Sequence, residues 1–465
     1  MRLVEGDGRR VLAARRRSDE GERSHADGQQ RRRFGGRRRR PATPAIFVPE
    51  PVDVLERSFL VTTDSTGKAG QSVLFSPLAL RDLVLPNRIV ISPMCQHAAD
   101  DGRASDWHLV HLGKFALGGA GLIFAESTAV SPHGRVGIND LGLWKDDQVA
   151  PLARVVDFIH AQSGLIGVQL AHTGRKAGSF PVWEGGQPFT AADLDRFAGA
   201  EGWRRIGPSA VSAGPTWTVP EELDRAGMEE VAQQFEAATR RALAAGFDAV
   251  ELHFAHGYLI PTFLSSLANR RTDEFGGPIE NRMRYPLEIA SRVRAAWPAG
   301  RPLFCRISAV DGAADSWDLA DSIIFARELK AVGVDVVDVS SGGLSEEVSR
   351  MNVPRGLGFQ LEFAETIRRE AQVLTQAVGM IVDGPQAEEA LRSGAADLVA
   401  IGRAALEDPY WPRRAAEQLG HGPDYSAWPV RHGAWLTKRE QSLGTALRER
   451  KDLLSATRRS VDIRN

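Results

Sequence analysis

The 465-residue sequence predicts an α/β fold, a closed (β/α)8 TIM barrel with a long insertion after the third strand and an extension at each end. Two observations predict this fold. Eight short runs of aliphatic and β-branched residues recur between positions 88 and 403, and helix-like segments separate them. Short strands that are apolar on both faces are typical of a parallel sheet covered by helices, and eight such units favour a closed barrel. An open, doubly wound sheet is the weaker alternative, because no GxGxxG fingerprint follows the first strand.

The strand candidates end in polar or small residues, as the strands of such a barrel do. In chain order they are RIVISPM (88–94), GLIFAES (121–127), IGVQLAH (166–172), AVELHF (249–254), LFCRISA (303–309), VDVVDVS (334–340), GMIVDG (379–384) and LVAIGR (398–403). The clearest helix between them covers 228–247, and Gly246 marks its end. Its apolar residues recur at spacings of three and four, which predicts one buried face: Val231, Phe235, Ala238 and Ala242.

One connection is unusually long. About fifty residues rich in Trp, Gly, Pro and Asp separate the third strand candidate from the helix at 228. A loop of that length in a compact domain is usually functional. We therefore expect it to form a lid or a wall of a substrate site.

The two ends of the chain differ from the barrel, which we assign to residues 73–435. Residues 1–72 lack an amphipathic period and predict a disordered, Arg-rich extension. Residues 1–40 hold 14 Arg against six acidic residues, a charge of +8, so the remainder carries −9 of the net −1. We interpret the arginine run as a solvated tail, with a nucleic-acid or membrane patch as the alternative. Residues 436–465 form a C-terminal extension whose leucines predict a short, solvated helix: Leu443, Leu447, Leu453 and Leu454.

The composition excludes several classes of protein. Two cysteines, Cys95 and Cys305, cannot supply the four thiolates of an iron–sulfur cluster or a zinc ribbon, and they suggest no disulfide framework. No run of about 18 apolar residues predicts a membrane span, and the N-terminus lacks the apolar stretch of a secretory signal. We expect a cytoplasmic protein that binds neither membranes nor nucleic acid.

The active site of a TIM barrel lies at the carboxyl ends of its strands. Polar residues at the predicted strand ends therefore converge although some 300 residues separate them along the chain. They are Cys95, Glu126, Ser127, Gln169, His172, His253, His256, Arg306, Ser340, Ser341, Asp383, Gly384, Gly402 and Arg403.

Two of these turns and one arginine have a specific chemical meaning. DGP at 383–385 and IGRA at 401–404 close the last two strands, where barrels commonly hold a phosphate on glycine N–H groups and a helix N-terminus. Arg403 adds a bidentate donor. The alternative is two ordinary strand-to-helix turns. Arg306, inside an apolar strand, needs an anion or a strongly polar partner, and a structural ion pair across the barrel is equally compatible.

The stretch ELHFAHGYLI, 251–260, places two histidines three residues apart. Residues three apart on a strand point to opposite faces, so His253 and His256 share a site only if the chain turns between them. The end of the fourth strand provides that turn. Zinc would need a third protein ligand as well.

These motifs resemble the old yellow enzyme family of flavin-dependent ene-reductases, in the class of xenobiotic reductases and thermophilic-like members. The matching stretches are LFSPLALRDLVLPNRIVISPMCQ, DWHLVHLGKFALGGAGLIFAESTAV, VQLAHTGRKA, GFDAVELHFAHGYLIPTFLSSLANRRTDEFGGPIENR and LVAIGRAALEDPYWP. They cover most of the segment 74–435.

The resemblance implies FMN as the cofactor, with NADPH or NADH as the reductant. It places Ser92, Pro93, Met94 and Cys95 along the flavin, Ser127 and Gln169 at its pyrimidine edge and Arg306 near N1 and O2. Gly384, Gly402 and Arg403 would take the phosphate. Cys95 would tune the redox behaviour of the flavin and touch the substrate.

The resemblance also implies the chemistry. His253 and His256 would hydrogen-bond an oxygen of an electrophilic alkene, the small-molecule substrate, while flavin N5 delivers hydride to the β-carbon. Tyr258 would then protonate the α-carbon from the opposite face. Since the resemblance assigns the two imidazoles to an oxygen, we expect no metal.

The sequence departs from the class at two places. SPMCQH puts His97 where the class usually has a tyrosine that helps to hold substrate, so the substrate range could differ. In WPVRHGAWL, 428–436, no arginine stands in the register of the members that send one into a neighbouring subunit's site. Trp435 is our candidate for that role, in a homodimer or homotetramer.

Two other functions stay open at this stage. One is a flavin-binding barrel with little or no ene-reductase turnover, which the set of His253, His256 and Tyr258 disfavours. The other is an enzyme like the 2,4-dienoyl-CoA reductases, which the two cysteines disfavour, because those enzymes carry an iron–sulfur cluster.

Overall fold

The computed structural model describes residues 72–195, 197, 203–345, 355–421 and 425–462, without the side chains of 448, 449 and 451–462. The predicted N-terminal extension therefore lies outside the described residues except for Ser72. That residue anchors the start of the barrel, because its hydroxyl and the backbone N–H groups of Val73 and Leu74 all donate to the buried carboxylate of Glu388.

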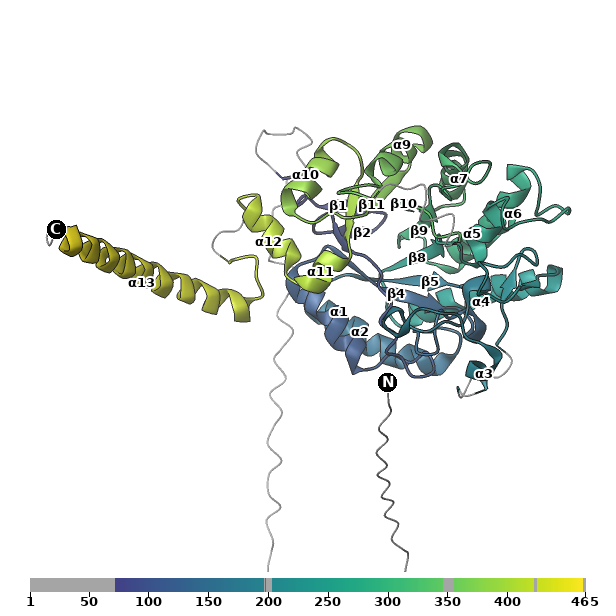
Figure 1. The fold of residues 1–465 in the computed structure, drawn as a ribbon, viewed down its shortest axis with the longest axis horizontal. Coiled ribbons are helices and arrows are strands. Elements are labelled where there is room, and N and C mark those ends of the chain that lie inside the picture. The colour runs from purple at the N-terminus through teal and green to yellow at the C-terminus, as the bar shows by residue number, and fades with distance from the viewer. Residues whose placement is uncertain (1–71, 196, 198–202, 346–354, 422–424, 463–465) are drawn as a thin grey trace, which may run out of the picture. The chain divides into compact units, whose positions relative to one another are not determined.

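Eight parallel strands close into a barrel, in the order β10-β11-β12-β3-β4-β5-β8-β9, which confirms the predicted fold class. Figure 1 shows the helices outside these strands. The strands are β3 (Ile89–Ile91), β4 (Leu122–Ala129), β5 (Ile166–Ala171), β8 (Ala249–Phe254), β9 (Leu303–Ser308), β10 (Val336–Ser340), β11 (Leu374–Val378) and β12 (Leu398–Ile401). All but β11 are buried along their whole length, which explains why they read as continuous apolar runs.

The seventh strand was predicted wrongly. The apolar run at 379–384 is a turn, and β11 lies just before it, at Leu374–Val378. Gly379 and Met380 both have positive φ angles, +126° and +52°, which a strand cannot accommodate. The sequence LTQAV was not recognised as a strand because Thr375 and Gln376 are polar, although the centre of the segment is buried.

Helices alternate with the strands as predicted. They are α1 (Asp106–Gly118), α2 (Val149–Ala161), α4 (Arg225–Ala244), α5 (Leu259–Leu264), α6 (Ile279–Ala296), α7 (Leu319–Ala331), α9 (Leu361–Ala371), α10 (Gly384–Arg392), α11 (Arg403–Glu407) and α12 (Trp411–Gln418). Helix α4 starts where the side chain of Asp224 accepts a hydrogen bond from the N–H of Gly227. Its predicted apolar face is buried, with Phe235, Ala238 and Ala242 fully covered.

A short antiparallel hairpin, β1 (Leu78–Leu80) and β2 (Leu83–Leu85), precedes the barrel. Leu80 and Leu85 pack in one apolar cluster with residues near the amino ends of the barrel strands, including Phe124 and Phe304. The hairpin therefore covers the amino end of the barrel and leaves the polar residues to the carboxyl end.

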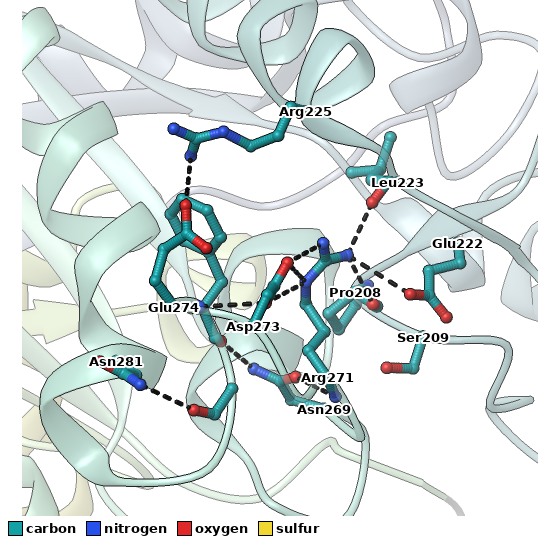
Figure 2. A network of polar contacts seen from close by, with 12 residues as sticks. Pro208, Ser209, Glu222, Leu223, Arg225, Asn269, Arg271, Asp273, Glu274 and Asn281 are labelled. Carbon is teal, nitrogen blue, oxygen red and sulfur yellow. Dashed lines mark hydrogen bonds and ion pairs between the residues drawn. The ribbon is translucent and has the colours of Figure 1, made fainter.

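The long connection after β5 has structure of its own. It contains the short helix α3 (Ala191–Leu194) and a two-stranded sheet of β6 (Ile206–Gly207) and β7 (Glu221–Glu222). Arg271 holds this sheet against the segment that follows α5. Its guanidinium donates to the backbone carbonyls of Pro208 and Leu223 and pairs with Asp273, as Figure 2 shows.

The C-terminal helix is longer than predicted. Helix α13 runs from Val430 to Asp462, so the boundary that we placed between 435 and 436 falls inside a helix. The stacked rings of Tyr410 and Trp428, 5.1 Å apart, connect α12 to the segment before α13. None of the helices in the described ranges has the length and apolarity that a membrane crossing requires.

Candidate functional site

The segment after β3 carries Ser92 and Cys95, and a buried glutamate fixes it. Glu126 lies at an irregularity in β4, where the register with β5 shifts between Ala125 and Ser127. A bulge of this kind re-aims a side chain. The Glu126 carboxylate accepts the backbone N–H of Gln96 and lies 3.4 Å from Nε2 of His108. Burial raises the pKa of Glu126, and the hydrogen bond from His108 opposes this effect.

His253 and His256 lie side by side, as the geometry of the sequence required. Strand β8 ends at Phe254, and positive φ angles at His256 (+65°) and Gly257 (+68°) turn the chain back. The two rings have centroids 5.0 Å apart, and His253 Nε2 lies 3.3 Å from His256 Nδ1. Gly257 cannot carry a side chain, since an added Cβ would lie 2.5 Å from the carbonyl oxygen of Gly343.

Neighbouring groups decide which ring nitrogens can donate. His253 Nδ1 accepts the N–H of Ala255, at 3.3 Å, which leaves the proton of the neutral ring on Nε2. His256 Nε2 lies 2.8 Å from the hydroxyl of Ser340. When Ser340 donates to that nitrogen, His256 carries its proton on Nδ1, and both N–H groups face the same region.

Both imidazoles are held neutral. Burial lowers the pKa of His253 well below its usual value, and His256 and Arg306 lower it further. Burial also lowers the pKa of His256 to about 3, with smaller effects from the charges of Arg306 and Lys176. Neutral rings provide N–H donors without a fixed charge, which suits an oxygen that gains negative charge during a reaction.

Tyr258 completes this group. Its ring centroid lies 4.8 Å from that of His253 and 6.5 Å from that of His256. Burial raises the pKa of Tyr258 far above its usual value, and Cys95 and Asp140 act in the same direction. The phenol is therefore protonated at every physiological pH and can donate a proton.

Lys176 stabilises the turn at His256 and Gly257 through hydrogen bonds to backbone carbonyl groups. Its ammonium group donates to the carbonyl oxygens of His256, at 2.9 Å, and of Gly343. It belongs to the HTGRKA stretch after β5, so two strand-end loops are fixed to each other. The position of Lys176 in the sequence did not indicate this structural role.

Arg306 crosses the barrel interior from β9 to β3. Its guanidinium donates to Asp338 Oδ2, at 2.8 Å from Nε, and to the hydroxyl of Ser92 at 3.0 Å. Arg306 therefore has a structural ion pair, with a partner on the neighbouring strand β10 and not across the barrel. Asp338 was not predicted, because an acidic residue within VDVVDVS gives no sign of its partner.

The remaining predicted flavin contacts lie on adjacent strands. Ser127 and Gln169 are paired in the register between β4 and β5. The Gln169 side chain donates to Glu251 Oε1 at 2.7 Å, so its amide orientation is fixed. Burial raises the pKa of the Cys95 thiol, with Asp140 and Glu126 adding to this effect, so Cys95 is uncharged.

His97 is part of an ion pair rather than a lone imidazole. Its Nδ1 lies 2.6 Å from Oδ1 of Asp140, whose other oxygen accepts the N–H groups of Val136 and Gly137. Burial works against a charged ring, but the hydrogen bond and charge of Asp140 raise the pKa of His97 above 6.5. The ring also meets Trp183 edge to face, at 5.5 Å. The long connection thus reaches the strand-end site, as we expected.

The assignment of Gly384 to a phosphate site needs correction. Gly384 begins α10, its N–H donates to Gln418 Oε1 at 2.8 Å, and its missing Cβ leaves room for Ala415. Asp383 caps the same helix by accepting the N–H of Gln386. This turn is therefore an ordinary helix start, and the end of β11 lies instead at Gly379 and Met380.

The turn after β12 has the open space that Gly384 lacks. An added Cβ on Gly402 would meet nothing closer than Met94 Sδ, at 3.8 Å. Arg403 follows it as the first residue of α11, is exposed, and has no hydrogen bond or ion pair within the described part of the chain. Gly402 and Arg403 follow β12, and the positive-φ turn at Gly379 and Met380 follows the neighbouring strand β11.

Trp435 lies on α13 with 69% of its surface exposed. Lys438 covers one side of the indole, at 5.3 Å from the ring centroid. The structure of the single chain does not bring Trp435 to the strand-end site. Its predicted role requires a second subunit and stays a prediction.

The residue set fits FMN. Buried, oriented polar groups lie on successive strands and suit a flavin ring. An open glycine turn and an arginine without a partner among the described residues suit its phosphate. No cluster of three or more His, Cys, Asp or Glu side chains in the described ranges could hold a metal ion.

Comparisons with known proteins agree with this geometry. Residues 73–421 match the NADH:flavin oxidoreductase / NADH oxidase family. The chain is 43% identical to an NADPH dehydrogenase of Geobacillus sp. (strain WCH70) over 352 residues, which are 75% of this chain and 95% of that protein. It is 43% identical to an NADPH dehydrogenase of Bacillus subtilis (strain 168) over 348 residues, 74% of this chain and 95% of that protein.

Solved structures show the same barrel. Morphinone reductase superposes with a TM-score of 0.61 at 29% identity, covering 77% of this chain and 92% of its own. An old yellow enzyme homologue from Zymomonas mobilis superposes with a TM-score of 0.62 at 26% identity, covering 76% and 94%.

Proposed function

Because the chain belongs to the NADH:flavin oxidoreductase / NADH oxidase family, as an FMN-dependent oxidoreductase of the old yellow enzyme type that uses NAD(P)H, we propose that it reduces activated C=C bonds. The substrates are α,β-unsaturated carbonyl compounds and related electrophilic alkenes such as nitroalkenes. The observation that carries this proposal is the convergence of two neutral imidazoles and one protonated phenol where β8 ends.

His253 and His256 bind the carbonyl oxygen of the substrate. In this proposal the hydroxyl of Ser340, 2.8 Å from His256 Nε2, donates to that nitrogen and keeps the proton of His256 on Nδ1. This N–H and the Nε2–H of His253 then point to one oxygen. The oxygen gains negative charge when hydride, which FMN supplies after taking it from NAD(P)H, reaches the β-carbon. Two oriented donors in a buried site stabilise that charge more strongly than water does.

Tyr258 protonates the α-carbon. Its raised pKa keeps the phenol in the acid form until a carbon base appears beside it. Cys95, which is also uncharged, lies in the segment after β3 and would border both the cofactor and the substrate.

Several residues would hold FMN itself. Ser92, Pro93 and Met94 follow β3, Ser127 and Gln169 face the barrel from β4 and β5, and Arg306 reaches Ser92 from β9. For the phosphate we replace Gly384 by Gly379 and Met380 and retain Gly402 and Arg403.

His97 and Trp435 adapt the substrate site. The His97–Asp140 pair, in contact with Trp183 of the long connection, replaces a phenol by an imidazole beside a carboxylate. Trp435 contributes from a neighbouring subunit in a homodimer or homotetramer.

Three observations of colour test the proposal. Purified protein with FMN should be yellow, NADPH should bleach it without air, and 2-cyclohexenone should restore the colour. Protein that cannot be loaded with FMN would contradict the whole assignment. Protein that NADPH bleaches but that no enone, maleimide or nitroalkene reoxidises would contradict the alkene reduction alone.

A further inference from the structure

Two carboxyl groups share one cation inside the barrel, directly below the strand-end site. Asp338 Oδ2 accepts hydrogen bonds from Nε and Nη2 of Arg306 and from Nε2 of Gln376. Glu251 Oε1 lies 3.9 Å from Arg306 Nε. Both carboxyl side chains have no exposed surface. In the described ranges, Arg306 is the one cation within ion-pair distance of either group.

Each carboxyl group also has one oxygen without a hydrogen-bond partner among the described residues. These atoms are Glu251 Oε2 and Asp338 Oδ1. Both groups lie beside the same guanidinium, and burial together with the neighbouring Asp338 raises the pKa of Glu251 well above its usual value. Two ionised carboxylates cannot satisfy each other, because neither has a proton to donate.

The charges therefore do not balance unless a proton is present. Arg306 keeps its charge, so two ionised carboxylates would leave a net charge of −1 among buried side chains. An uncompensated buried charge costs several kcal/mol, and a group in that position takes up a proton instead. Two adjacent carboxyl groups that share one proton are a known solution to this problem.

We propose that Glu251 and Asp338 share one proton, with Asp338 ionised against Arg306 and Glu251 neutral, so that the three side chains together carry no net charge. Glu251 is then a positioning residue that acts through Arg306 and does not touch a substrate. The proton gives Glu251 a donor for Asp338 while its other oxygen still accepts from Gln169.

The shared proton affects the histidine pair and the proposed flavin site because Arg306 lies beside both. Arg306 is the register partner of His253 on β8 and of Asp338 on β10, so the charge of this group is felt at the histidine pair. A net charge of −1 there would oppose both a negatively charged reduced flavin and the negative oxygen of the substrate. The proton count does not depend on the proposed alkene reduction, but the effect on FMN rests on the proposed place of Arg306 beside the ring.

Infrared spectroscopy of the FMN-loaded protein at neutral pH counts the proton directly. The wild-type spectrum should contain the C=O stretch of a protonated carboxyl group that is lost in Glu251→Gln. It should also be lost in Asp338→Asn, because Glu251 then ionises against Arg306. The matched control is Glu388→Gln, which removes a buried glutamate whose pKa is lowered by hydrogen bonds from Ser72 and from backbone N–H groups, so only carboxylate bands should change. A Glu251→Gln spectrum that loses carboxylate bands alone would overturn the proposal.

The reduction potential of FMN gives a second, independent readout. Glu251→Gln should leave the preference for reduced over oxidised FMN within about threefold of wild type, since it replaces a neutral group by a neutral group. The double variant Glu251→Gln/Asp338→Asn leaves Arg306 unbalanced and should strengthen that preference at least tenfold, about 30 mV for a two-electron couple. A tenfold effect of Glu251→Gln alone would overturn the shared proton. A lost carboxyl band without any shift in the double variant supports the shared proton and contradicts the place of Arg306 beside FMN.

Discussion

Ser340→Ala tests whether the histidine pair depends on its orientation. The Ser340 hydroxyl lies 2.8 Å from His256 Nε2. In the proposed mechanism it donates to that nitrogen and so keeps the proton of His256 on Nδ1. Alanine removes the donor without adding bulk. A buried polar atom left without its partner costs about 1–3 kcal/mol. If this free energy is lost from the stabilisation of the transition state, in which the substrate oxygen gains charge, the rate of enone reduction falls by roughly fivefold to 150-fold.

Stopped-flow absorbance measures the effect. FMN in the variant is first reduced with NADPH without air, and the rate of its reoxidation by 2-cyclohexenone is then recorded. The flavin content of the purified protein, read from its visible spectrum, shows whether FMN binding is intact.

Ser341→Ala is the matched control. The neighbouring hydroxyl donates to Gln360 Oε1 at 2.7 Å and does not contact His256. Its loss should change the reoxidation rate by less than about twofold, because the lost hydrogen bond does not orient the proton of His256. Equal losses in the two variants, or a Ser340→Ala rate within twofold of wild type with full FMN content, would refute the reasoning about the proton on His256.

Three further predictions concern other parts of the structure. His253→Ala should slow enone reduction by about a hundredfold to a thousandfold in steady-state assays, and a loss below tenfold would contradict its role as a donor to the oxygen. The free energy of unfolding, measured with urea, should fall as the pH is lowered from about 6.5 towards 5. Burial lowers the pKa of His172 and of His256 to about 3 in the folded protein, so the unfolded chain binds more protons in this pH range. Equal free energies of unfolding at pH 7 and pH 5 would contradict this prediction. Arg271→Lys should lower the melting temperature by several degrees, since two backbone carbonyls lose a donor at about 1–3 kcal/mol each, whereas the exposed Arg270→Lys should leave it unchanged.

Much of the fold follows from the sequence because each barrel strand is short, buried and apolar. The same rule failed at β11. Gln376 is buried there because its side chain donates to Asp338, a partner far along the chain that no local pattern reveals. The apolar turn at 379–382 was then mistaken for the strand, and the phosphate assignment moved with it to Gly384.

The site was predicted unevenly for a similar reason. His253, His256 and Tyr258 follow from the end of one strand and the turn after it, so local geometry sufficed to bring them together. Lys176 and Asp140 act through contacts between different loops. Their positions depend on how the strand-end loops pack, which a single sequence does not encode in any short pattern.

Tyr258→Phe tests the central claim most directly. In the proposed reaction the phenol, which stays protonated and lies against His253, is the proton donor for the alkene reduction. In an anaerobic half-reaction, NADPH should reduce FMN in this variant as in wild type, while reoxidation by 2-cyclohexenone should slow by at least about a hundredfold, as the loss of a general acid predicts. Tyr410→Phe, which alters a phenol stacked on Trp428 near α12, should behave as wild type. A Tyr258→Phe protein that is reoxidised as fast as an active wild type would contradict the account.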